Sequence, residues 1–248
     1  MLLWNCGGNT DKEDQKHIKV GVSSGLEYSV AQVAQQVAKA KYGLEVELVP
    51  FNDYVVPNEA LNQGDLDVNA FQSKQRGYKL AIVGKTFIYP IAAYSRKIKN
   101  LTELQPGSTI VIPNDPTNGG RFLLLLQKNG LLTLRDNVGL LPKVTDITAN
   151  PKNLKILELE APQLTRVLDD KEVTIAIINN TFASQVDLIP SRDGLFVEDR
   201  KSLYVNLIGA REDNKNERKV KEFVQAYKSA EVEQAAKKDF KGAAIKGW

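Results

Sequence analysis

The chain has 248 residues, of which 42% are hydrophobic and 25% charged, and its 33 basic and 30 acidic residues leave a net charge of +3. This composition excludes collagen-like, low-complexity and disordered classes, and the interspersed charges leave no nucleic-acid-binding footprint. One cysteine and one histidine exclude a disulfide framework and a histidine metal triad, and no apolar run reaches the ~18 residues that cross a bilayer.

The chain begins with residues 1–16, of which 7–16 are small, polar and charged, and we expect this segment to be a flexible lipoprotein tether. Ile18, Val20 and Val22 then alternate with other residues, which predicts a strand. Apolar residues at helical spacing follow and predict an amphipathic helix that ends near Gly43, and a second alternating strand begins at Leu44. This strand–helix–strand order predicts an α/β protein with a parallel sheet.

The same reasoning predicts further elements along the rest of the chain. Helices are expected at 57–63, 121–128, 163–168, 220–227 and 232–240. Extended segments are expected at 65–71, 82–94, 109–112, 154–159, 173–178 and 204–210. We interpret Asp65 and Asp67 as solvated turn acids. Gly84-Lys85-Thr86 has the end of a phosphate-binding loop but neither the earlier glycine nor a following helix, so we expect no nucleotide binding.

Three polar residues stand where strands meet loops or helices. Arg121 follows a loop rich in turn formers, in which Asp115 or Thr117 can cap a helix, so it either binds a carboxylate or pairs with a nearby acid at the surface. Asn179 ends an apolar strand, at the edge where α/β sheets bind ligands. Asn206 interrupts an apolar strand, so it either satisfies a neighbouring loop or faces a ligand. No nucleophile–base pair or metal set is visible, so we expect neither an enzyme nor a cofactor.

Longer blocks of the sequence point to a family. They include HIKVGV at 17–22, GDLDVNAFQ at 64–72, IPNDPTNGGR at 112–121, NPKNLKILELEAPQL at 150–164 and AREDN at 210–214. Together they resemble the NlpA-type lipoproteins, the methionine-binding proteins of bacterial ABC importers, from His17 to Trp248. The resemblance implies a two-lobed periplasmic-binding-protein fold with a hinge and an interlobe ligand cleft. By this resemblance lobe one takes 17–93 and 204–248, and lobe two takes 94–203.

The resemblance also implies a binding site. Arg121 matches the arginine that takes the ligand carboxylate, and a guanidinium fork suits that group. Asn179 and Asn206 match the asparagines that hold the amino-acid backbone, including its ammonium. Tyr54 and Phe71 match the aromatics around the side chain, where a thioether gains from ring contacts. No metal or catalytic residue is implied.

Two departures from the family bear on function. After Gln72 the family usually has a histidine and a short helix, whereas Ser73-Lys74-Gln75 here leads straight into Arg76. Cys6 stands before a polar tether, as a lipidated cysteine does, but Trp4 and Asn5 replace the small residues of a usual lipobox.

We therefore expect a lipoprotein anchored to a bacterial envelope membrane through Cys6, on the periplasmic face in a Gram-negative cell. It would bind L-methionine, or a closely related amino acid or short peptide, and deliver it to an ABC permease and its ATPase. The alternative is a binding-impaired family member that acts as an envelope or surface interaction lipoprotein.

Overall fold

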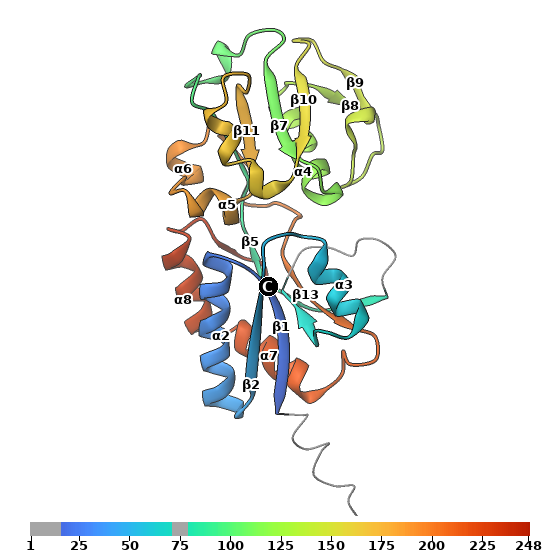
Figure 1. Cartoon of the computed structure of the whole chain (residues 1–248), viewed down its shortest axis with the longest axis vertical. Helices are drawn as coiled ribbons and strands as arrows, with labels where there is room; N and C mark the ends of the chain where they lie inside the picture. The colour runs from blue at the N-terminus through green and yellow to red at the C-terminus, as the bar shows by residue number, and fades with distance from the viewer. Residues whose placement is uncertain (1–15, 71–78) are drawn as a thin grey trace, which may run out of the picture. The chain divides into compact units, whose positions relative to one another are not determined.

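The computed structural model describes residues 16–70 and 79–248, which fold into two units. Unit 1 holds the described residues up to Phe87 together with Val205–Gly242 and Lys246–Trp248. Unit 2 holds Ile88–Tyr204 and Ala243–Ile245. Each unit contains one five-stranded sheet with helices, so the α/β prediction is confirmed (Figure 1).

The sheet of unit 1 has the strand order β2-β1-β3-β13-β4. Its strands are β1 (His17–Ser23), β2 (Glu45–Phe51), β3 (Val68–Asn69), β4 (Leu80–Lys85) and β13 (Leu207–Arg211). Its helices are α2 (Leu26–Tyr42), α3 (Val56–Gln63), α7 (Arg218–Tyr227) and α8 (Ala230–Asp239). β1 runs parallel to β2 and β3, as the strand–helix–strand pattern predicts, whereas β13 is antiparallel to β3 and β4, which makes the sheet mixed.

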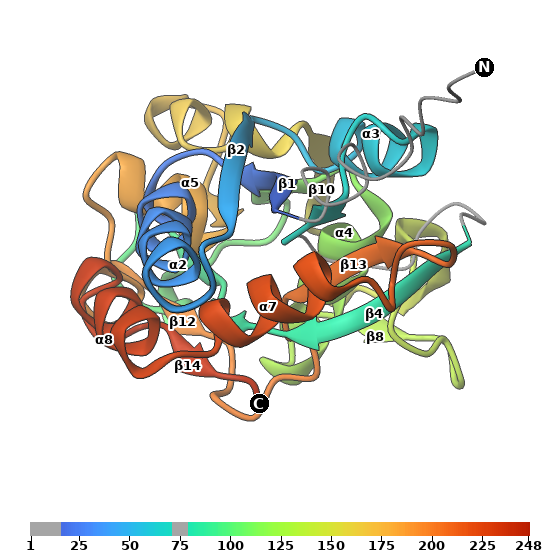
Figure 2. The ribbon, with the colours of Figure 1, turned by 90° about the horizontal axis from the view of Figure 1, so that it is seen from below.

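Local sequence accounts for the first elements of unit 1. Ile18, Val20 and Val22 point into the core because they alternate along β1, and all three are buried. Helix α2 ends as predicted at Gly43. The φ of this residue is 64°, a left-handed conformation that favours glycine because glycine has no Cβ. The buried face of α2 packs against α7 and α8, and α7 lies along β4 (Figure 2).

The sheet of unit 2 has the strand order β10-β7-β11-β6-β12. Its strands are β6 (Ala92–Tyr94), β7 (Thr109–Pro113), β10 (Lys155–Leu159), β11 (Ile175–Ile178) and β12 (Phe196–Val197), and β8 (Thr133–Leu134) pairs with β9 (Ile147–Ala149). Its α-helices are α4 (Pro116–Lys128), α5 (Asn180–Gln185) and α6 (Pro190–Asp193). Its 3-10 helices are η1 (Leu101–Glu103), η2 (Val144–Asp146), η3 (Ala161–Gln163) and η4 (Arg166–Asp169). A separate ladder joins β5 (Phe87–Ile88) to β14 (Ile245–Lys246).

The core of unit 2 forms where α4 covers its sheet. Leu123, Leu125 and Leu126 of α4 are buried in one apolar cluster with Ile110 of β7 and Ile177 of β11. Burial of this apolar surface holds α4 in place. The parallel pairing of β7 with β10 and β11 brings the carboxyl ends of these strands to one edge of the sheet.

Helix α4 begins earlier than the sequence pattern predicts. It starts at Pro116 rather than at Arg121, because the side chain of Asp115 caps it and proline suits the first helical position. Position 120 in this helix holds a glycine, and a Cβ there would come within 2.9 Å of the Leu141 backbone. Local capping, together with the close approach of Leu141, thus makes a run of turn formers the first turn of a helix.

Two predicted extended segments are broken in the structure. The segment 82–94 divides into the end of β4, then β5, then β6, and the chain passes from unit 1 to unit 2 after Phe87. The expected start of lobe two at 94 is later than this point, because Ala92–Tyr94 pairs with β11 in the sheet of unit 2. The segment 204–210 is a strand only from Leu207, so Tyr204 and Asn206 lie before β13.

The prediction that Asp67 is a solvated turn acid is wrong. Its Oδ2 accepts a hydrogen bond from the Lys19 backbone N–H at 2.8 Å, and its Oδ1 lies 3.0 Å from Nζ of the buried Lys219. Asp67 therefore joins β1, which contains Lys19, to α7, which contains Lys219. A non-local cation partner of this kind leaves no trace in local periodicity.

Candidate functional site

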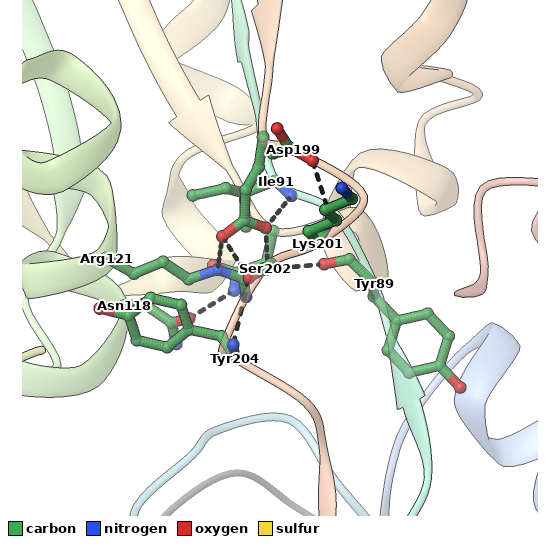
Figure 3. A network of polar contacts seen from close by, with 10 residues as sticks. Tyr89, Ile91, Asn118, Arg121, Asp199, Lys201, Ser202 and Tyr204 are labelled. Atoms are coloured by element: carbon green, nitrogen blue, oxygen red, sulfur yellow. Dashed lines mark hydrogen bonds and ion pairs between the residues drawn. The ribbon is translucent and has the colours of Figure 1, made fainter. Parts of the chain in front are cut away.

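Arg121 lies on α4 with only 3% of its surface exposed. Its Nε donates a hydrogen bond to Glu198 Oε1 at 2.8 Å, and its Nη2 donates to Glu198 Oε2 and to the Tyr89 carbonyl at 3.0 Å. These bonds form one side-on guanidinium–carboxylate fork (Figure 3). A buried cation requires such a partner, because an unpaired charge in the interior is costly.

Glu198 is fully engaged by groups of unit 2. Besides Arg121, its carboxylate accepts from the Ser202 hydroxyl at 2.7 Å and from the Ile91 backbone N–H at 3.4 Å. The Tyr204 ring centre lies 5.1 Å from Arg121 Cζ, a cation–π distance. Burial raises the pKa of Tyr204 to about 12, with a smaller lowering by Arg121 and a raising by Glu198. The guanidinium is thus held on one edge by a carboxylate and faces an aromatic ring.

The structure resolves the two interpretations of Arg121 in part. Arg121 does pair with an acid, but it is buried rather than at the surface, and the fork edge expected for a ligand is occupied by Glu198. Of its five N–H donors, the two on Nη1 make no hydrogen bond to any described residue, while those on Nε and Nη2 are used. Nη1 is therefore the one nitrogen of the guanidinium without a hydrogen-bond acceptor among the described residues.

Asn179 lies where the sequence pattern places it, directly after β11 and at the start of α5. It is buried, and its Nδ2 donates to Asn118 Oδ1 at 2.9 Å. Its Oδ1 is also buried and accepts no hydrogen bond from the described residues. A buried acceptor without a donor costs about 1–3 kcal/mol, so a donor supplied by a ligand would be strongly favoured there.

Helix α4 connects Asn179 to Arg121. Asn118 and Arg121 are three residues apart on this helix, so they are neighbours on one face. The Asn118 amide in turn donates to both oxygens of Asp115, at 3.1 and 3.0 Å. Burial raises the pKa of the Asp115 carboxyl above its ordinary value, although the hydrogen bonds from Asn118 oppose the shift. Unit 2 thus brings the predicted arginine and one predicted asparagine to the same end of α4.

Asn206 belongs to unit 1 and is buried just before β13. Its backbone N–H donates to Phe87 at 2.9 Å and its carbonyl accepts from Thr86 at 2.7 Å. Its side-chain Nδ2 donates to Oε2 of the buried Glu27 at 3.3 Å. The expectation that this asparagine lies within a strand is wrong, because its backbone bonds to the segment after β4 instead of continuing β13.

The remaining predicted residues are placed in part. Tyr54 lies between β2 and α3 in unit 1 and is half-buried. Phe71 and Cys6 lie outside the described residues. Their proposed roles stay predictions.

Sequence reasoning missed Glu198, Asn118 and Glu27. Glu198 and Glu27 occur in polar or helix-start contexts where acids are common, so nothing local distinguishes them. Asn118 stands three residues after Asp115, the spacing between an N-cap and the N3 position, and this spacing is the one signal that was available. Within 16–70 and 79–248, no group of His, Cys, Asp and Glu side chains is arranged to hold a metal ion.

No helix within the described ranges has the length and apolar character needed to span a membrane.

Comparison with known proteins gives full-length matches. A family model described as NlpA lipoprotein matches residues 18–248. The D-methionine-binding lipoprotein MetQ of Yersinia pestis is 64% identical, over 100% of this chain and 94% of the relative. A crystal structure of the methionine-binding protein MetQ has a TM-score of 0.91 and 64% identity, covering 95% of this chain and 99% of that one. A nutrient-binding protein from Burkholderia cenocepacia, bound to methionine, has a TM-score of 0.89 and 45% identity, covering 93% and 100%.

Two further points follow from these matches. The relatives are named as binding proteins rather than enzymes, which agrees with the expectation from sequence. The alignment to the Yersinia pestis protein runs over 256 positions while this chain has 248 residues, so that relative carries residues that this chain lacks.

Proposed function

The chain belongs to the NlpA lipoprotein family, and we propose that it binds methionine, or a closely related amino acid or short peptide, for a bacterial ABC importer. Two of the relatives reported above are the MetQ protein of Yersinia pestis, named for binding D-methionine, and the MetQ of the crystal structure, named for binding methionine. The single structural observation that carries the proposal is in unit 2. There, Arg121 on α4 has one guanidinium nitrogen, Nη1, without a hydrogen bond among the described residues. Asn179, which bonds to Asn118 of the same helix, has a buried Oδ1 without a donor in the described ranges.

Arg121 is proposed to bind the ligand carboxylate through Nη1. Glu198 already neutralises the guanidinium, so the site presents a dipole rather than a net charge. This suits a zwitterion, which is itself neutral and brings one charge of each sign. Each charge-assisted hydrogen bond to the carboxylate would contribute about 1.5–3 kcal/mol.

Asn179 is proposed to accept a hydrogen bond from the ligand ammonium at Oδ1. An ammonium carries three donors and no acceptor, and Oδ1 is a buried acceptor without a donor. Unit 1 is proposed to supply Asn206 for the same amino-acid backbone, and Tyr54 and Phe71 for the ligand side chain. None of these groups transfers a proton, so the proposed activity is capture and release.

Binding to wild type and variants, measured by calorimetry with L- and D-methionine, tests this function. Arg121→Ala should weaken methionine binding about 100-fold, since it removes the carboxylate partner. Arg121→Lys keeps a cation for Glu198 and should weaken binding while the fold persists. Arg135→Ala is the matched control, because Arg135 is an exposed arginine of unit 2 that pairs with Asp146 at 2.7 Å. Unchanged affinity in both Arg121 variants would overturn the assignment.

We also propose that Cys6 carries a lipid that holds the protein to an envelope membrane, where it delivers its ligand to a permease and ATPase. The family description supports the anchor. Cys6→Ser should move the protein from the membrane fraction to the soluble fraction, and mass spectrometry should find acyl chains on wild type only. An unmodified Cys6 in a membrane-bound protein would contradict the proposal.

The second candidate function is a family member that no longer binds amino acids and serves as an envelope interaction lipoprotein. Two observations favour it: the chain is shorter than the alignment to its relative, and Glu198 occupies the fork edge of Arg121. Thermal melting with a panel of amino acids and dipeptides separates the two functions. A rise in melting temperature with methionine supports capture, and no shift with any compound supports the alternative.

A further inference from the structure

We propose that Asp115 and Asn118 are positioning residues that set which end of the Asn179 amide is presented to the ligand. They do so through a series of three hydrogen-bonded side chains, in which Asp115 contacts Asn118 and Asn118 contacts Asn179. The result is a site that prefers an α-ammonium over neutral groups of similar size. This inference rests on the proposed function and extends it to the selectivity of the same site.

This series of hydrogen-bonded side chains begins at Asp115. The Asp115 side chain accepts from the Asn118 backbone N–H at 3.0 Å, which caps α4. Its two oxygens also accept from Asn118 Nδ2 at 3.1 and 3.0 Å. An ionised carboxylate can only accept hydrogen bonds, so a reversed Asn118 amide would set its oxygen against two carboxylate oxygens. The carboxylate therefore allows one orientation of Asn118.

The orientation of Asn118 then determines that of Asn179. Asn118 is 1% exposed, and its Oδ1 faces Asn179 Nδ2 at 2.9 Å. Because Asn118 offers an acceptor, Asn179 must offer its nitrogen in return. A reversed Asn179 would place two carbonyl oxygens in contact, so its orientation is transmitted from Asp115 through one intervening amide.

The series ends at Asn179 Oδ1, an acceptor without a donor in the described part of the chain. Asn179 is 6% exposed, and its Oδ1 is buried without a donor among the described residues. A buried group prepared for one kind of partner rejects a ligand that cannot supply it, by more than a simple difference in size would. Oδ1 accepts from an ammonium, whereas an amide nitrogen at the same place would repel one.

The arrangement predicts a specific change when the carboxylate becomes an amide. In Asp115→Asn the side chain can present either an oxygen or an NH2 group to Asn118, so neither Asn118 nor Asn179 is held in one orientation. A hydroxyl can donate or accept and tolerates both orientations of Asn179, whereas an ammonium tolerates only one. Selectivity for methionine over its 2-hydroxy analogue, 2-hydroxy-4-(methylthio)butanoate, should therefore fall.

The experiment measures Kd for methionine and for this hydroxy analogue by calorimetry. In Asp115→Asn the ratio of the two dissociation constants should move about tenfold toward the hydroxy analogue. Asp115→Ser keeps a helix-capping side chain without the charge and should move the ratio in the same direction. The ratio is the diagnostic quantity, because a merely structural role would weaken both ligands alike.

Ser229→Ala is the matched control. Ser229 caps α8 by accepting from the Val232 backbone N–H, and it has no part in the series from Asp115 to Asn179. Its loss should lower the melting temperature and leave the ratio unchanged.

The outcomes separate the two proposals. If wild type binds methionine and the ratio in Asp115→Asn and Asp115→Ser equals that of wild type, the positioning role is overturned and the proposed function stands. If wild type binds no amino acid, the proposed function fails and the positioning role fails with it. A shifted ratio in both variants, with an unshifted ratio in Ser229→Ala, supports the positioning role.

Discussion

Each unit of the molecule contains a buried ion pair, and the two pairs differ in what they leave unused. In unit 2, the side chains of Arg121 and Glu198 are 2% and 10% exposed. In unit 1, those of Lys219 and Asp67 are 5% and 19% exposed. Burial alone therefore does not distinguish a binding residue from a structural one.

The difference lies in hydrogen-bonding capacity. Asp67 uses one oxygen for Lys219 and the other for the Lys19 backbone, so the pair links α7 to the sheet. The Lys219 ammonium also lies 3.7 Å from Glu217. Arg121, in contrast, uses Nε and Nη2 within unit 2 and has Nη1 left over among its described neighbours. The unused donors on Nη1 are the reason that we propose Arg121, and not Lys219, as a ligand-binding residue.

The largest effect is expected from Glu198→Gln. This change leaves a buried guanidinium without its counter-ion, and breaking a buried pair on one side costs about 3 kcal/mol or more. Urea denaturation should show that loss in the free energy of unfolding. A loss below about 1 kcal/mol would mean that the Arg121–Glu198 pair contributes little to stability, as exposed pairs do.

Asp67→Asn is the corresponding change in unit 1. We expect a loss of about 2 kcal/mol of stability, smaller because the pair is more exposed and Glu217 remains near Lys219. Methionine affinity should stay within about twofold of wild type, since neither residue of this pair is among the proposed ligand contacts. A large loss of affinity in Asp67→Asn would break the distinction between the two pairs.

Asn206→Ala sharpens the comparison on the side of unit 1. The change removes a side-chain amide that we propose to contact the ligand backbone. Calorimetry should therefore show methionine binding weakened about tenfold. Asn216→Ala supplies the control, because Asn216 is an exposed asparagine of the same unit. If Asn206→Ala binds like wild type, the Asn206 side chain serves only to hold Glu27.

The smallest effect concerns pH and Tyr204. Its pKa is about 12 in the folded protein, because of burial first, and 10.0 is the ordinary value. Between these two pH values the unfolded chain has lost the phenolic proton and the folded protein has kept it. The free energy of unfolding therefore falls as pH rises through this range.

Tyr204→Phe removes that titration, so its unfolding free energy should fall less steeply from pH 10 to pH 12 than that of wild type. Denaturant titrations at both pH values measure the two slopes. Equal slopes would show that Tyr204 is ionised as easily in the folded protein as in the unfolded chain.

Much of the fold follows from local patterns. The alternation of Ile18, Val20 and Val22 predicts β1, and a glycine at the end of an amphipathic run predicts the end of α2. The apolar run before Asn179 predicts both β11 and the position of that asparagine at its end. These features are readable because strands and helices bury residues at fixed intervals along the chain.

The amino-acid sequence by itself determined the α/β class, the family resemblance and the polar residues worth testing. Only the tertiary structure decided that Arg121 pairs with Glu198, 77 residues further along the chain, and that Asn179 bonds to Asn118, 61 residues before it. It also decided which atoms of these residues remain unused. The reason is physical: periodicity reports which face of an element is buried, whereas hydrogen-bond partners are chosen by groups that meet only after the chain has folded.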